Sequence, residues 1–472
     1  MFDLEISYSI LLVVFILAAC SFEFVNGFHD TANAVATVIY TNTLKPWTAV
    51  IWSGLFNFFG VFYGGIAVAM GIVNLLPVES LIDQNIYHGL SMIGALLISA
   101  IFWNLLTWYY GIPCSSSHTL VAAILGVGIA YYLLPQAAGS GGGVNWGKAQ
   151  EIGLSLLLSP AVGFTLTILL MLLIRMLTRK TQQADELFKE PKKNSPPPLW
   201  IRGILVVTCT LVSFFHGSND GQKGVGLVML VLIAIVPFHF ALDSRLDVSV
   251  VREPLVKIEN VLLSIDSANL SAPDRQKLSS TLGMTTQLRQ LTATASTTTD
   301  IAKESRFVVR RDVMLMDKNI KSLVKDEDIR FSDTDKATLA AGMKTVRKLT
   351  DYSPTWVIAM ISISLGIGTM IGWKRIVKTI GEKIGKEHLT YAQGASAELV
   401  AASTIGLSTG FGWPVSTTQV LSSAVAGSMV ASKGVKNLQP ATVRNILLTW
   451  ALTLPVVTVL SGTLFLLFRS LF

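Results

Sequence analysis

The sequence predicts an all-α polytopic membrane protein, built from two inverted five-span repeats with interrupted helices and a soluble helical insert in the second repeat. Three observations predict this class: the hydropathy, ten apolar segments, and a pair of motifs that occurs twice. Mean hydropathy is +0.55, and charged residues make up only 14% of the 472 residues, against roughly 25% in a typical soluble domain. The net charge of +7 sits in short segments beside apolar stretches, where it sets orientation in a membrane. It therefore does not indicate a nucleic-acid-binding protein.

Each apolar segment is long enough, at about 20 residues, to cross about 30 Å of hydrocarbon. Five lie in the first repeat, residues 1–177, at 6–25 continuing to 41, 47–76, 88–110, 115–134 and 151–177. Five more lie in the second repeat, at 200–238, 354–372, 390–411, 414–432 and 441–468. Between the repeats, residues 178–199 contain several Lys and Arg residues and three consecutive prolines, which predicts a solvated linker.

The second repeat is divided by a polar segment. Residues 239–353 separate its start, residues 200–238, from its remainder, residues 354–472. The segment is charged and polar, with apolar residues such as Leu255 and Ile258 at helical spacing. This pattern predicts a soluble bundle of amphipathic helices with a small core of its own.

Positive charges in short loops predict the orientation of the chain. The linker at 178–199 and the loop at 373–388 are rich in Lys and Arg, so both are expected in the cytoplasm. This requires an odd number of crossings in each half, with one interrupted crossing at 200–238. Both termini and residues 239–353 are then expected on the extracytoplasmic side of the inner membrane. The two halves would have opposite orientations, as in transporters built from inverted repeats.

Two motifs recur in the same order in both halves. Residues 27–33, GFHDTAN, correspond to residues 216–224, HGSNDGQKG, so that Asp30 pairs with Asp220. Downstream, GIPCSSSH and GWPVSTTQ align around a shared proline. The aspartate and the proline are 83 residues apart in the first copy and 194 in the second, and the difference of 111 is close to the 115 residues of the insert.

The repeated aspartates are candidate functional residues. An ionised carboxylate inside a bilayer costs several kcal/mol unless it faces a polar cavity and has partners. The Gly, Asn, His and Ser residues around Asp30 and Asp220 favour a break in each helix, with freed backbone groups lining a cavity. The alternative is a pair of aspartates that only link helices by hydrogen bonds.

Three hydroxyl residues follow the shared proline in each copy. Proline suits the first turn of a helix, and the free amides, the hydroxyls and the positive end of the helix dipole together form an anion site. Ordinary N-capping would explain only one hydroxyl in each copy. The candidate anion ligands are Ser115, Ser116, Ser117, Ser416, Thr417 and Thr418.

An anion beside two carboxylates requires cations that neutralise the set. Protons, sodium ions or a divalent metal such as Mg²⁺ bound to the anion could supply this charge. Asp30 and Asp220 are the candidate ligands if a metal or sodium ion is bound. His29, His118 and His216 lie inside the motifs, and a histidine exchanges a proton near neutral pH. A structural hydrogen-bonding role suits each of them equally well, and no pattern indicates a covalent cofactor.

These motifs resemble those of the inorganic phosphate transporter (PiT) family, and most closely its bacterial low-affinity, proton-coupled branch. The resemblance covers both halves, about three quarters of the chain. It implies a secondary transporter that binds inorganic phosphate between inverted repeats and carries it as a neutral complex with a divalent metal. Our hypothesis for the site is that Asp30, Asp220 and Glu398 take protons or hold the accompanying cation, while Asn33 and Asn219 orient it.

The chain departs from the family pattern at three positions. Lys223 stands where the first copy has asparagine, and its ammonium would occupy the place of a cation. Asn57 stands at a position where sodium-coupled relatives have a glutamate. The differences at Lys223 and Asn57 both favour protons over sodium as the coupling ion. Gln419 replaces a histidine, which weakens the case for a symmetric proton role of His118. Glu398 matches a membrane glutamate of the family, with an ion pair to Lys223 as its alternative role.

The leading hypothesis is a transporter that imports inorganic phosphate by proton symport. A sodium-coupled phosphate permease, a sulfate permease of the same family and a passive channel are alternatives. An intramembrane hydrolase would use Ser115 to Ser117 and His118 as nucleophile and base, but no acidic residue follows to orient the histidine. The sequence also leaves a homodimer in the lipid bilayer open.

Overall fold

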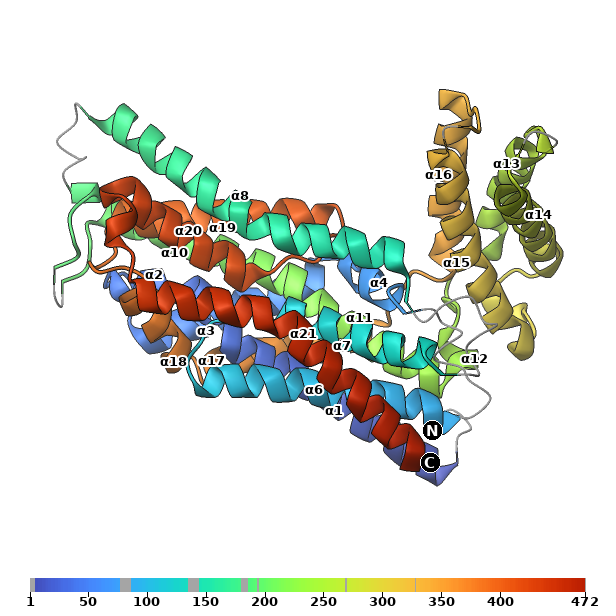
Figure 1. The fold of residues 1–472 in the computed structure, drawn as a ribbon, viewed down its shortest axis with the longest axis horizontal. Helices are drawn as coiled ribbons and strands as arrows, with labels where there is room; N and C mark the ends of the chain where they lie inside the picture. Colours follow the sequence, from blue (N-terminus) through green and yellow to red (C-terminus); the bar gives the residue numbers. More distant parts are fainter. Residues whose placement is uncertain are drawn as a thin grey trace. The chain divides into compact units, whose positions relative to one another are not determined.

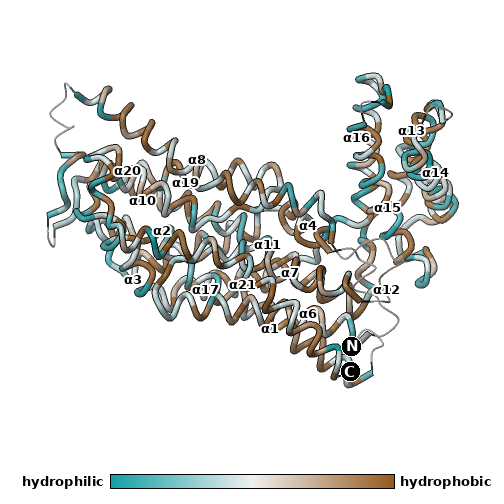
Figure 2. Tube along the Cα trace, viewed as in Figure 1, coloured by the Kyte–Doolittle hydropathy of each residue, from teal (hydrophilic) through white to brown (hydrophobic). Residues whose placement is uncertain are grey.

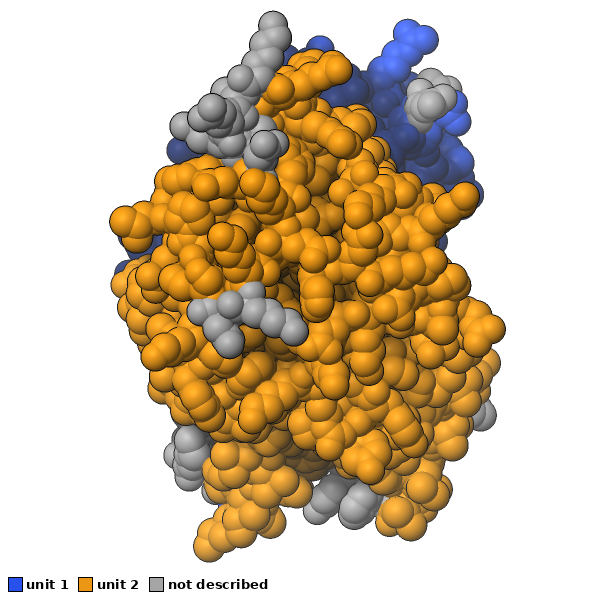
Figure 3. Space-filling model, turned by 90° about the vertical axis from the view of Figure 1, so that its left-hand side faces the viewer, with its two compact units in different colours: residues 1–5, 232–353 blue, residues 6–231, 354–472 orange. Residues whose placement is uncertain are grey.

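The computed structural model describes residues 5–76, 86–134, 144–179, 186–192, 195–267, 270–326 and 328–471. Their regular secondary structure is helical, with two isolated β-bridges, which confirms the all-α class. Residues 180–185 and 193–194 of the predicted linker lie outside the described residues. The chain forms two compact units, residues 1–5 with 232–353 and residues 6–231 with 354–472, which Figure 3 colours separately.

The second of these units contains the apolar segments except for the end of segment 200–238, and each segment predicted from hydropathy corresponds to one helix or to consecutive helices (Figure 1). The helices of the first half are α1 (Ile6–Asp30), α2 (Ala32–Tyr40), α3 (Pro46–Tyr63), α4 (Ala67–Val73), α6 (Ile86–Tyr109), α7 (Ser116–Tyr132) and α8 (Trp146–Thr178). Those of the second half are α10 (Leu199–His216), the π-helix η2 (Gly217–Gly221), α11 (Gln222–Ile235), α17 (Thr355–Met370), α18 (Lys374–Lys378), the π-helix η7 (Thr379–Lys383), α19 (Tyr391–Gly410), α20 (Thr417–Lys433), the short η8 (Val435–Asn437) and α21 (Pro440–Leu471).

Five of the described helical stretches are long and apolar enough to cross a membrane, or seven if the bent pairs α3–α4 and α17–η7 each count as one span. The prediction of five full spans in each half is therefore not met by length and composition alone. The helices outside this set are α7, α19 and α20. Both α7 and α20 have 17 residues, and their rise of about 26 Å falls short of the hydrocarbon thickness of about 30 Å.

The aspartate motifs do not unwind the backbone, so the expected breaks at these two places are wrong. At the α1–α2 junction, Thr31 has helical dihedral angles (φ −50°, ψ −37°), and its amide bonds the carbonyl of Gly27 at 3.0 Å. The second copy, residues 217–221, forms a π-helix that links α10 to α11. Gly, Ser and Asn tolerate an irregular backbone without imposing one, and a π-turn is a local widening often found at functional sites.

Helices also end just before the hydroxyl segments. Gly111 and Gly412 have positive φ angles of 66° and 71°, which glycine adopts without steric cost. The amide that follows each glycine bonds the carbonyl five residues earlier, from Ile112 to Thr107 at 3.0 Å and from Trp413 to Ser408 at 2.9 Å. These are Schellman-type helix ends. They terminate α6 and α19, and the chain then starts α7 and α20 after an extended Ser115 and Ser416.

The two halves interlock through their last helices. Helix α7 packs on α21 and α20 packs on α8, so each hydroxyl-bearing helix lies against the last helix of the other half (Figure 1). Glycines permit the close approach: a Cβ on Gly126 would lie 2.2 Å from the carbonyl oxygen of Thr458, and one on Gly163 would lie 2.6 Å from that of Val420. Small residues at helix contacts are typical of membrane bundles.

Outward-facing leucines along α8 and α21 are exposed. In Figure 2 these long helices are mostly brown, the colour of apolar residues. An exposed apolar surface of this kind is expected where helices face lipid.

The other unit has its own core, formed by buried apolar side chains that include Leu255 and Ile258. It contains α12 (Pro237–Phe240), η3 (Val248–Val251), α13 (Arg252–Leu263), α14 (Ala272–Thr292), η5 (Thr298–Asp300), α15 (Lys303–Lys325), α16 (Asp333–Val346) and η6 (Arg347–Leu349). Within this unit, Arg310 is fully buried. It donates hydrogen bonds to the backbone carbonyls of Ala241 at 3.1 Å and Thr350 at 3.0 Å, and burial lowers the pKa of its guanidinium.

Candidate functional site

The candidate site is a buried cluster of charged and hydroxyl side chains. It is assembled from the α1–α2 junction, the η2–α11 segment and the first turns of α7 and α20. Every site residue predicted from the sequence is at most 3% exposed. Buried charge at this density requires partners for each group, so the contacts of each carboxylate decide what the cluster can do.

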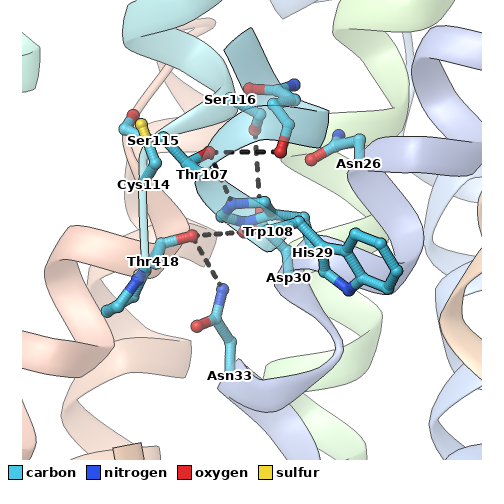
Figure 4. A network of polar contacts seen from close by, with 12 residues as sticks. Asn26, His29, Asp30, Asn33, Thr107, Trp108, Cys114, Ser115, Ser116 and Thr418 are labelled. Atoms are coloured by element: carbon cyan, nitrogen blue, oxygen red, sulfur yellow. Dashed lines mark hydrogen bonds and ion pairs between the residues drawn. The ribbon is translucent and has the colours of Figure 1, made fainter. Parts of the chain in front are cut away.

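Asp30, the last residue of α1, is bonded by both hydroxyl helices (Figure 4). Its Oδ2 accepts a hydrogen bond from Ser116 Oγ at 3.2 Å, and its Oδ1 accepts one from Thr418 Oγ1. His29 Nδ1 lies 3.3 Å from Oδ1, while His29 Nε2 lies 3.2 Å from Thr107 Oγ1. The carboxylate of one half is therefore held by helix starts from both halves.

Asp220, in η2, forms the ion pair of the cluster. Its Oδ1 lies 2.5 Å from the ammonium nitrogen of Lys223, and its Oδ2 accepts a hydrogen bond from Thr417 Oγ1 at 3.1 Å. The Lys223 ammonium also donates to Ser117 Oγ and, at 3.0 Å, to the carbonyl oxygen of Val415. All three donor directions of this ammonium are used.

The two motif copies make equivalent contacts. Within each copy, the second hydroxyl bonds the aspartate, as Ser116 does with Asp30 at 3.2 Å and Thr417 with Asp220 at 3.1 Å. Between copies, the residue three positions after each aspartate donates to the third hydroxyl of the other copy, as Asn33 does to Thr418 at 3.2 Å and Lys223 to Ser117. The alignment drawn from the sequence thus corresponds to a shared pattern of contacts.

His216 lies between the two carboxylates. Its Nε2 is 3.5 Å from Asp220 Oδ2 and 3.7 Å from Asp30 Oδ2, and its Nδ1 lies 3.0 Å from Asn57 Oδ1. One ligand atom from each of Asp30, His216 and Asp220 lies within 4.8 Å of the others. A carboxylate pair with one imidazole suits a divalent cation, and a proton on His216 would balance the same charges.

The six hydroxyls divide into two kinds. Ser115 and Ser416 are N-caps whose Oγ atoms accept from the amides of His118 at 3.1 Å and Gln419 at 3.2 Å, which stabilises the helix starts. The remaining four bond carboxylates, the Lys223 ammonium or a backbone carbonyl. An anion in the cluster would therefore compete with Asp30 and Asp220 for hydroxyl donors.

Two further predicted residues act on the backbone or on a cap. His118 Nδ1 lies 2.7 Å from Ser115 Oγ. Asn219 donates to Thr409 Oγ1 at 2.9 Å and accepts from the amide of Val415 at 3.2 Å. These contacts of Asn219 link η2 to the end of α19 and to the connection between α19 and α20.

Glu398, on α19, forms a separate buried group. Its two carboxyl oxygens accept hydrogen bonds from Thr37 Oγ1 and, at 2.5 Å, from Thr208 Oγ1. The alternative of an ion pair with Lys223 is wrong, because that ammonium pairs with Asp220. Two threonines from neighbouring helices supply the partners that the sequence could not identify.

Sequence reasoning missed buried polar residues on α1 and α11. Glu23 and Asn26 are both 0% exposed and precede Asp30 by seven and four residues, a spacing that places all three on one helix face. Gln222 donates from Nε2 to the carbonyl of Ser218 at 2.7 Å. A glutamate within a predicted membrane helix is a candidate by default, so Glu23 carried a usable signal.

Comparison with known proteins adds independent findings. The sequence profile of the phosphate transporter family matches residues 26–461. The chain is 38% identical over 492 residues to the low-affinity inorganic phosphate transporter PitB of Escherichia coli, covering 98% of this chain and 97% of PitB. It is 38% identical over 490 residues to PitA of the same organism, with the same coverage, and 28% identical over 463 residues to a probable low-affinity inorganic phosphate transporter of Bacillus subtilis, with 98% of each chain covered.

One solved structure has a similar fold. A sodium-dependent phosphate transporter superposes with a TM-score of 0.56 at 18% identity, covering 98% of this chain and 100% of the other. At this identity the likeness concerns the fold alone.

Proposed function

The chain belongs to the phosphate transporter family, and on this premise we propose that it is a secondary transporter that imports inorganic phosphate by proton symport. The similar relatives are named as transporters, so the chain is not an enzyme, and the serine hydrolase alternative is dropped. It is a multi-pass membrane protein by family and by its apolar helices. An extracytoplasmic location of both termini and of residues 239–353, the inverted arrangement of the repeats and a homodimer remain proposals.

The observation that carries this proposal is the competition for hydroxyl donors around the aspartates. An ionised carboxylate only accepts hydrogen bonds, whereas a protonated one also donates. Ser116 and Thr417 donate to the two aspartates. Protonation of Asp30 or Asp220 would weaken these hydrogen bonds, because the acceptor would no longer be charged, and would let the hydroxyls turn to phosphate oxygens. The Lys223 ammonium would supply positive charge. Proton binding and phosphate binding would then favour each other, as symport requires.

A divalent cation that travels with phosphate is the second candidate partner. The ligand atoms of Asp30, His216 and Asp220 gather within 4.8 Å, and carboxylates, phosphate and water are the ligands that Mg²⁺ prefers. In this version the cargo is a neutral metal-phosphate complex, and the cation neutralises the carboxylates in place of protons. Sodium is disfavoured at the second copy because the Lys223 ammonium already contacts the oxygen atoms that a sodium ion would use.

The geometry also requires conformational change. Phosphate cannot reach side chains that are at most 3% exposed unless helices move. We propose that one half moves against the other around the cluster, which is the usual form of alternating access.

Uptake into proteoliposomes tests the proposal. The purified full-length chain is reconstituted, and uptake of radiolabelled phosphate is measured with an inward proton gradient, with an inward sodium gradient, and with or without Mg²⁺. We expect accumulation driven by the proton gradient, abolished by a protonophore, insensitive to sodium and poorly competed by sulfate, which cannot share a proton at neutral pH. The exposed-residue variant Glu387→Gln, whose partner Lys433 lies at the surface, serves as the matched control. Absence of proton-driven uptake, or full competition by sulfate, would refute the proposal.

A further inference from the structure

Glu23 is a buried carboxyl group that the site described above does not use. It lies on α1 and is 0% exposed. Its Oε2 accepts a hydrogen bond from Asn26 Nδ2 at 3.3 Å, and its Oε1 has no hydrogen-bond partner among the described residues. A buried acceptor without a partner is rare in native structures and calls for an explanation.

Space for this carboxyl group is provided by Gly224 on α11. A Cβ on Gly224 would lie 2.1 Å from Glu23 Cγ and 2.7 Å from Oε1. The unpartnered oxygen therefore faces the backbone of α11 one residue after Lys223. Because Asp30 lies beside His216 at the other end of the same helix pair, α1 and the α10–α11 segment carry two facing rows of polar groups.

The charged surroundings of Glu23 come mainly from this facing row. Asp220, Lys223 and His216 are the groups that interact with it electrostatically. On its own helix, the Cys20 thiol is the nearby titratable group. Helix α17, which also packs on α1, has no titratable residue in Thr355–Met370. Among the described residues, α6 contributes no group that interacts electrostatically with Glu23.

Charge balance leaves Glu23 without a cation of its own. The Lys223 ammonium is 2.5 Å from Asp220 and has two further acceptors, and no ion pair to Glu23 forms among the described residues. Glu398 differs, because hydroxyls bond both of its oxygens. An unpaired carboxylate in a dry interior is so costly that the group takes up a proton instead. The free Oε1 is the atom available to carry it.

We propose that Glu23 is a proton-binding site of the transport cycle, which carries one proton on Oε1 while phosphate is occluded. This proposal rests on the proposed proton symport. The proton comes from water on the side where phosphate enters, forms the O–H bond at Oε1, and returns to water on the other side when that bond breaks. Phosphate adds negative charge near Lys223 and Asp220, so it binds better when Glu23 is neutral, and the two events are linked.

Glu23→Gln is the informative variant, because glutamine keeps the shape of the side chain and cannot ionise. Wild type, Glu23→Gln, Glu23→Asp and the surface control Glu387→Gln are reconstituted as full-length protein. Two quantities are measured: the phosphate accumulation ratio under a proton gradient across a pH series, and the infrared band of a protonated carboxylic acid in H₂O and D₂O. The infrared band reports the proton itself and does not depend on transport.

We expect Glu23→Gln to lower the accumulation ratio at least about tenfold, a coupling of the size typical for linked sites, and to lose a protonated-carboxyl band that the wild type and Glu387→Gln retain. Glu23→Asp should keep a band and shift the pH at which accumulation is half-maximal. An unchanged band in Glu23→Gln, or a lost band with unchanged accumulation, would overturn the proposal, since the second result would make Glu23 a purely structural acid. If Glu23→Gln does not fold, an unshifted pH profile in Glu23→Asp overturns it instead.

These outcomes are distinguishable from failure of the proposed function. A wild type that does not accumulate phosphate under a proton gradient refutes proton symport, and the role of Glu23 in coupling falls with it. A wild type that accumulates phosphate beside a fully active Glu23→Gln refutes only the Glu23 site.

Discussion

Replacing Lys223 by asparagine tests whether its ammonium takes the place of a bound cation beside Asp220. The side chain is 1% exposed. Its nitrogen lies 2.5 Å from Asp220 Oδ1 and 3.0 Å from the carbonyl oxygen of Val415, and it also bonds Ser117. The equivalent residue of the first copy is Asn33, so Lys223→Asn makes the two copies alike. The substitution removes the positive charge and leaves three oxygen atoms facing the vacated space.

The expected loss of stability follows from the buried ion pair. Removing one partner of such a pair costs about 3–5 kcal/mol, because the other charge stays buried without compensation. A cation that binds the three oxygens would restore part of this loss, by about 2.7 kcal/mol when its concentration is about 100 times its dissociation constant. Sodium is tested because it carries the same single charge as the ammonium and is bound by oxygen ligands.

The assay is thermal unfolding of the detergent-purified protein in NaCl and in KCl at equal ionic strength. Lys223→Asn should unfold at a lower temperature than wild type in KCl, and NaCl should recover part of the difference, whereas wild type should respond equally to both salts. Phosphate uptake by the variant should become sodium-dependent. Lys148→Asn is the control, because Lys148 pairs with the half-exposed Glu151 and such pairs contribute about 0–1 kcal/mol. Equal stability of Lys223→Asn and wild type in KCl would refute the reasoning.

Three further predictions concern the site, the packing and the insert. Asp30→Asn and Asp220→Asn should each slow phosphate uptake by at least about tenfold, which corresponds to a loss of about 1.4 kcal/mol of transition-state stabilisation. Near-normal uptake by both variants, with pH and Mg²⁺ varied, would contradict the site assignment. Gly126→Leu should shift the protein to aggregates in size-exclusion chromatography, because even a Cβ at this position would lie 2.2 Å from a carbonyl oxygen of α21. The control Gly153→Leu should elute as wild type, because the space around Gly153 is open. Burial raises the pKa of the Asp312 carboxyl group in the folded protein. Above this folded pKa, the ionised carboxylate lowers the free energy of unfolding. The loss disappears below about pH 4, where the carboxyl group is protonated in the unfolded chain as well. Asp312→Asn should therefore slow hydrogen exchange in α15 of the full-length protein by at least about twofold at pH 7, and an equal gain at pH 3 would argue against this explanation.

The duplicated motifs show how far a sequence can locate a site. Aligning GFHDTAN with HGSNDGQKG paired Asp30 with Asp220, and the structure brings His216 to within 3.7 Å of both carboxylates. The alignment worked because the two motif copies make equivalent contacts. It did not predict that Asn219 holds the backbone of Val415, since the partner of an amide depends on neighbours that are distant in the chain.

Glu23 and the partners of Glu398 illustrate what was missed. Each stands alone in an apolar stretch, and the sequence contains no mark of which groups surround it. Thr37 and Thr208 bond Glu398, while Glu23 meets a glycine of α11. A shift of a few ångströms in helix packing would change which groups contact each glutamate. The hydropathy of the sequence does not report shifts of this size.

Helix positions, the polar insert and family membership follow from the chain alone, because hydropathy, helix caps and repeated motifs are local properties of neighbouring residues. The pairing of α7 with α21 and of α20 with α8, and the contacts of Lys223 with Ser117 and with the carbonyl of Val415, arise only when distant helices pack. Buried charges take whichever partner the packing places within hydrogen-bonding distance, and that distance is a property of the assembled bundle.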